Sequence, residues 1–147
     1  MTAPACQPIQ PMDEEFLQAI EKMAERHGRY DKAAYVFIYD ALQYTVEKLD
    51  KADLPREQRH ISGQNLLYGI SEYGLDQFGP LTRAVFNHWG IHRTQDFGEI
   101  VFALVEASLM SKTEKDSLQD FMDVYDFSEE FDWKKRKPVF KQRLSGS

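Results

Sequence analysis

The chain has 147 residues, of which 42% are hydrophobic, 13% aromatic and 29% charged. Its length fits one ordinary domain. Its composition excludes a disordered chain and a membrane-spanning one, because apolar residues are frequent but never run for 18 positions. The formal net charge of −6 is uneven: residues 1–133 hold 12 basic and all 24 acidic residues, a net −12, whereas residues 134–147 hold six basic residues. We predict a flexible arm at 1–11, a helical domain at 12–133 and a basic tail at 134–147.

The single cysteine and the N-terminal residues indicate the compartment. Cys6 has no second cysteine for an internal disulfide or a thiolate metal site. Residues 1–11 have neither the charged start nor the continuous apolar stretch of a secretion signal. We therefore expect a cytoplasmic protein without a membrane-spanning helix. The chain also lacks the glycine motifs that hold phosphate groups, so no cofactor is assigned.

Two amphipathic helices are predicted in the first third of the chain. The first begins at the N-cap Asp13 and ends at Gly28. The second runs from the N-cap Asp31 to Leu49 and carries apolar residues on more than one face. A narrow second stripe lies opposite its main apolar face, so this helix is predicted to be central or to lie at an interface. The stripe consists of Phe37, Ala41 and Tyr44.

Residues 50–60 form a predicted exposed loop, and helices follow it. Ser62 caps a helix that ends at Gly79, Pro80 begins another that ends at Gly90, and Thr94 caps the most apolar helix. Thr113 caps a shorter piece, and the aromatic-rich segment 124–133 is predicted to be non-helical. No strict alternation of apolar and polar residues indicates a strand. We predict an all-α, single-domain bundle of five or six helices.

Five short motifs are distinctive in combination: SGQ at Ser62–Gln64, FGP at Phe78–Pro80, NHWGI at Asn87–Ile91, DFGEIVF at Asp96–Phe102 and YDF at Tyr125–Phe127. Over residues 13–133 the chain resembles a Verruc-Plancto-restricted family of short conserved hypothetical bacterial proteins. The resemblance implies a bacterial cytoplasmic setting and assigns no activity. One position departs from expectation, because Asn65 stands where a glutamate would close a capping box with Ser62. The basic tail lies outside the resemblance.

His88 and His92 are the candidate metal ligands. Their spacing of four, with Asp96 and Glu99 following, is typical of ligands on one helical face. Gly90 lies between the histidines, so the pair is predicted to straddle a helix end, where this geometry is lost. The chain has no GxSxG motif that would present a nucleophilic serine, and its single cysteine lies in the predicted N-terminal arm, so no nucleophile is indicated. A small metal protein or enzyme centred on these histidines is our third hypothesis, and no metal or catalytic residue is assigned.

The basic tail has three interpretations. It could bind the phosphates of a nucleic acid, it could contact the acidic body or an acidic partner, or it could be a solvated terminus. Nucleic-acid or ribosome association through this tail is our second hypothesis. The residues that would carry it are Lys134, Lys135, Arg136, Lys137, Lys141 and Arg143.

Our first hypothesis is a non-enzymatic protein-interaction or adaptor module. Structural roles explain nearly every polar residue, yet four residues lie off the main apolar faces of their helices: Phe37, Tyr44, Tyr68 and Leu75. They are predicted to form a homodimer seam or a groove for a protein partner. In the alternative interpretation, the bundle buries these side chains internally.

Overall fold

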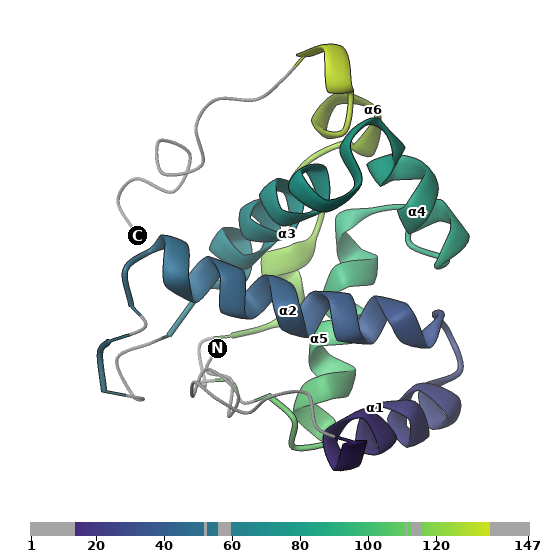
Figure 1. The fold of residues 1–147 in the computed structure, drawn as a ribbon, viewed down its shortest axis with the longest axis vertical. Helices are drawn as coiled ribbons and strands as arrows, with labels where there is room; N and C mark the ends of the chain where they lie inside the picture. Colours follow the sequence, from purple (N-terminus) through teal and green to yellow (C-terminus); the bar gives the residue numbers. More distant parts are fainter. Residues whose placement is uncertain (1–13, 52, 56–59, 111, 113–115, 136–147) are drawn as a thin grey trace.

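The structure is a computed structural model that describes residues 14–51, 53–55, 60–110, 112 and 116–135 (Figure 1). Within these residues every regular element is a helix, which confirms the predicted fold class. The predicted arm and residues 136–147 of the tail lie outside the described residues. The elements are α1 (Glu14–His27), α2 (Lys32–Lys48), α3 (Gly63–Phe78), η3 (Gly79–Leu81), α4 (Thr82–His88), α5 (Thr94–Glu106), η4 (Leu118–Phe121), α6 (Phe127–Glu130) and η5 (Trp133–Lys135), where η marks a 3-10 helix.

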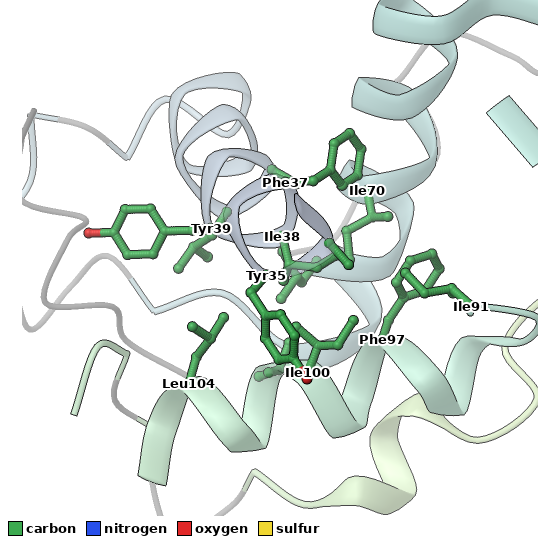
Figure 2. Packing of buried hydrophobic residues seen from close by; sticks show 14 of the residues in the cluster. Tyr35, Phe37, Ile38, Tyr39, Ile70, Ile91, Phe97, Ile100 and Leu104 are labelled. Carbon is green, nitrogen blue, oxygen red and sulfur yellow. The ribbon is translucent and has the colours of Figure 1, made fainter. Parts of the chain in front are cut away.

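Helix α2 is the centre of the bundle and packs against α1, α3 and α5. Figure 1 shows α2 crossing α5, with α3 on one side and α1 on the other. Such a helix must be apolar on more than one face, which the second stripe provides. In Figure 2, Tyr35 and Ile38 point towards Ile100 of α5, whereas Phe37 lies on the other side of α2, near α3.

Local capping signals place the starts of α2 and α3 as predicted. The Asp31 carboxylate accepts a hydrogen bond from the Ala33 amide at 2.9 Å, and the Ser62 hydroxyl accepts one from the Asn65 amide at 3.1 Å. These bonds satisfy amides that the first turn of a helix leaves unpaired. Two other predicted caps, Asp13 and Thr113, lie outside the described residues.

Two predictions for the C-terminal half are wrong. Thr94 is not the N-cap of α5: Arg93 holds that position, and the buried Thr94 hydroxyl donates to the Phe121 carbonyl at 2.7 Å. The Asp96 carboxylate instead accepts a hydrogen bond from the Arg93 amide. The segment 124–133 contains the one-turn helix α6 and the start of η5. Both differences depend on contacts between distant segments, which a local sequence pattern does not contain.

Candidate functional site

The two candidate histidines do not share a helical face. His88 is the last residue of α4, and His92 lies in the turn before α5. The intervening Gly90 has a φ of +88°, a left-handed conformation that ends a helix and favours glycine. Both histidines are exposed, and His92 Nδ1 lies 2.9 Å from Asn87 Oδ1. The pair therefore straddles a helix end.

The two candidate carboxylate ligands already have structural partners. Asp96 is buried and accepts hydrogen bonds from the His92 amide and the Tyr30 hydroxyl, both at 2.8 Å. Glu99 pairs with Arg29 at 2.6 Å. Burial, followed by the hydrogen bond to Asp96, raises the pKa of Tyr30 well above its usual range, so Tyr30 stays a hydroxyl donor. This network ties the α1–α2 turn to the start of α5.

The described residues contain no group of three or more His, Cys, Asp or Glu side chains placed to hold a metal ion. A second buried polar pair, which the sequence gives no signal for, joins α3 to α6. The Ser71 hydroxyl donates to the Glu130 carboxylate at 2.5 Å across 59 positions of sequence. Ser71 is fully buried, so no substrate reaches it, and the pair acts as a structural link.

Phe37, predicted to face a partner, is instead almost entirely buried, with 6% of its surface exposed. The Phe37 ring is buried inside the bundle because α3 and α4 both bring aromatic side chains to that side of α2. The alternative interpretation of internal burial therefore applies to Phe37, and it applies equally to Leu75, which is also buried. The rings within 5.6 Å of Phe37, between centroids, are those of Tyr73, Phe78, Phe86 and Trp89.

The other two predicted partner residues lie against different neighbours. Tyr44 packs on Tyr73, with ring centroids 5.1 Å apart, and so extends the Phe37 stripe along the α2–α3 contact. Tyr68 packs on Tyr125, which precedes α6. Both tyrosines are half-buried. The structure therefore brings Phe37 and Tyr44 to the same helix contact and turns Tyr68 towards the C-terminal segment.

Phe37 also forms part of the wall of an apolar pocket between three helices. This pocket, which we name the α1–α2–α3 pocket, has a volume of about 550 Å³. It falls within the size range of ligand sites in proteins. Its position could not be predicted from one helix, because three helices contribute to it. Its lining residues are Leu17, Ile20, Glu21, Asp31, Lys32, Ala33, Val36, Phe37, Asp40, Tyr73, Gln77 and Phe78.

The α1–α2–α3 pocket combines apolar walls with an acidic rim. Glu21, Asp31 and Asp40 line it, against one lysine, Lys32, among its described lining residues. Lys32 lies 4.0 Å from Glu21, so part of its charge is already compensated. Partial burial raises the pKa of Asp40, because the ionised carboxylate loses hydration there. A cationic group that entered the pocket would relieve this cost.

Acidic residues continue along α2 and α3 beyond the pocket. Burial raises the pKa of Tyr73, and the charges of Asp40 and Asp76 add to that increase. Burial likewise raises the pKa of Tyr44 to about 12, with additional contributions from Glu72 and Asp76. Several carboxylates therefore act on the same stretch of aromatic surface, which gives this face a negative potential.

A second pocket, of about 430 Å³, lies between the α4–α5 turn and the segment before α6. It includes Arg83, Arg93 and His92, but the carboxylates of Asp123 and Asp126 face the same space. Its charges are therefore balanced, and it offers no selectivity for an anion. A third pocket, lined mainly by α1 and α5, has a volume of about 250 Å³.

The chain matches no protein-family model, no curated protein and no solved structure. The resemblance to the Verruc-Plancto-restricted family therefore stays a prediction. No helix in the described ranges has the length and apolar character needed to cross a membrane. Of the predicted nucleic-acid contacts, Lys134 and Lys135 belong to η5, and the exposed Lys134 side chain follows Trp133. Arg136, Lys137, Lys141 and Arg143 lie outside the described residues.

Proposed function

We propose that the chain is a non-enzymatic cytoplasmic protein-interaction module and that the α1–α2–α3 pocket is its partner-binding site. The observation that supports this function is the combination of apolar walls and an acidic rim in one pocket of about 550 Å³. Apolar surface provides affinity when it is buried by a partner, and complementary charge provides selectivity. The expected partner is a protein segment that presents an aromatic or aliphatic side chain between lysines or arginines.

The histidine and serine clusters support this choice indirectly. Asp96 and Glu99 hold the α1–α2 turn against α5, and Ser71 and Glu130 hold α6 against α3. Each has a structural explanation that does not require a substrate. The α1–α2–α3 pocket has no such explanation, because its walls leave apolar surface uncovered.

The proposal is tested by selecting short random peptides that bind the full-length chain. We expect enrichment of peptides with one bulky apolar residue flanked by basic residues. Ala33→Trp places a large side chain inside the pocket, and it should weaken binding of the selected peptides at least tenfold, which corresponds to about 1.4 kcal/mol.

Ala84→Trp is the matched control, because Ala84 is an exposed alanine of α4 that is not among the pocket residues. It should leave peptide binding unchanged. Circular dichroism would verify that both tryptophan variants remain folded. Peptides that bind both variants and the parent chain equally would overturn the assignment of the pocket.

A further inference from the structure

The described part of the basic tail follows a residue that lies beside the C-terminal end of α3, and that end of α3 contributes to the α1–α2–α3 pocket. The Trp133 ring lies beside Gly79: a Cβ atom built on that glycine would be 3.8 Å from the ring. Gly79 directly follows Phe78, which lines the pocket. The last described helix, η5, therefore lies at the end of α3 that contributes Phe78 to the pocket, and the run of basic residues begins in η5.

The tail is long enough to place an apolar side chain in the pocket. Phe140 is seven residues beyond Trp133, and an extended chain covers about 3.3 Å per residue, or about 23 Å in total. Because the Trp133 ring lies beside Gly79, the residue after Phe78 of the pocket wall, a span of this length lets the tail reach the part of the pocket that α3 lines.

The chemistry of the tail matches that of the pocket. Val139 and Phe140 are adjacent apolar residues, with Lys134–Lys137 on one side and Lys141 and Arg143 on the other. The pocket is complementary in chemistry, because its lining residues combine apolar side chains with the carboxylates of Glu21, Asp31 and Asp40. Pro138 restricts the chain before the apolar pair, which lowers the entropy lost on binding.

We infer that the basic tail binds the α1–α2–α3 pocket of its own chain, with Phe140 against the apolar walls and the neighbouring basic residues along the acidic rim. The inference rests on the proposed binding role of that pocket. A tether of this length gives an effective concentration in the millimolar range, so a weak contact is sufficient for occupancy. The tail is then an internal competitor that a partner with the same chemistry must displace.

Paramagnetic relaxation in the full-length chain tests the inference. Cys6→Ser removes the native thiol, and Ser147→Cys provides a site for a nitroxide label. In ¹⁵N-labelled protein we expect strong broadening of the Ala33, Val36 and Asp40 amide signals. Asn65, at the opposite end of α3 from Phe78, should be affected much less. Phe140→Ser should reduce the broadening at the pocket at least threefold.

Leu144→Ser is the matched control, because it removes an apolar tail residue outside the run between the basic groups. It should leave the pattern unchanged. A mixture of ¹⁵N-labelled chain without nitroxide and unlabelled chain with nitroxide should show no broadening. Broadening in that mixture would assign the pocket to a second copy and overturn same-chain binding, as would an absence of broadening or insensitivity to Phe140→Ser.

The Phe140→Ser chain separates this inference from the proposed function. If its pocket still binds the selected peptides but the parent chain shows no tail contact, only the inference fails. If the Phe140→Ser chain does not bind peptides, the proposed function fails. If both hold, Phe140→Ser should bind the selected peptides more tightly than the parent chain does, because the internal competitor is gone.

Discussion

The surroundings of two carboxylates in this chain, Asp40 and Asp126, shift their pKa values in opposite directions. Asp40 is partly buried beside the pocket, and loss of hydration raises its pKa. Asp126 is exposed at the start of α6, where hydrogen bonds from the Ser128 hydroxyl at 2.5 Å and the Ser128 amide at 2.8 Å lower its pKa. Ionised Asp40 therefore lowers the stability of the fold beside the pocket, whereas Asp126 acts as an ordinary helix cap.

The opposite directions predict opposite pH effects. The folded chain holds the proton of Asp40 more tightly than the unfolded chain does, so ionisation of Asp40 lowers stability as pH rises. Asp40→Asn, made in the Phe140→Ser chain so that a bound tail does not offset the charge, should therefore increase the free energy of unfolding at pH 7, and the gain should disappear below about pH 4. Asp126→Asn should decrease stability at pH 7 and converge with the parent at acidic pH. Urea denaturation across this pH range measures both, and an Asp40→Asn chain that is less stable at pH 7 would contradict the assignment.

At the level of elements, close contacts determine how the helices pack. Gly69 of α3 lies against Thr45 of α2: a Cβ atom on Gly69 would be 2.9 Å from the Thr45 Cβ, closer than atoms pack. The missing side chain lets α2 and α3 approach each other beside the pocket that they line. The start of α5 is fixed differently, because the Thr94 hydroxyl donates to the Phe121 carbonyl and accepts from the Val124 amide at 3.1 Å.

Thr94→Val tests this joint between α5 and the segment after η4. The substitution keeps the shape of the side chain but leaves a buried carbonyl and a partly buried amide without the hydroxyl. It should lower the free energy of unfolding by about 1–3 kcal/mol. Thr94→Ser keeps both hydrogen bonds and serves as the control. Equal stability of the two variants in urea denaturation would show that the hydroxyl does not hold the segment.

The sequence predicts elements well where the determining interactions are local. Asp31 and Ser62 cap helices through amides two or three residues away, and both were predictable. Thr94 bonds to residues 27 and 30 positions later, so its spacing gives a misleading cap. The stripe containing Phe37 correctly marks α2 as apolar on two sides, but the pocket beside it exists only because α1 and α3 approach that helix.

At the scale of the whole molecule, the net charge separates into an acidic body and a basic tail. Self-repulsion among the carboxylates destabilises the compact body, and basic groups held near it relieve that repulsion. The carboxylates that line the α1–α2–α3 pocket are one place on the body where basic groups of the tail would reduce this repulsion. A tail that lies on the acidic body should therefore stabilise the folded chain.

The effect of paired charge removals distinguishes a bound tail from a solvated one. Lys137→Gln with Lys141→Gln removes two tail charges, and Lys22→Gln with Lys112→Gln removes two charges from exposed body residues. If the tail lies on the acidic body, both pairs should lower the free energy of unfolding by about 0.5 kcal/mol at low salt. Both losses should vanish near 1 M salt, where charges are screened beyond about 3 Å. Urea denaturation at the two salt concentrations measures this, and an effect of the body pair alone would show that the tail is a solvated terminus.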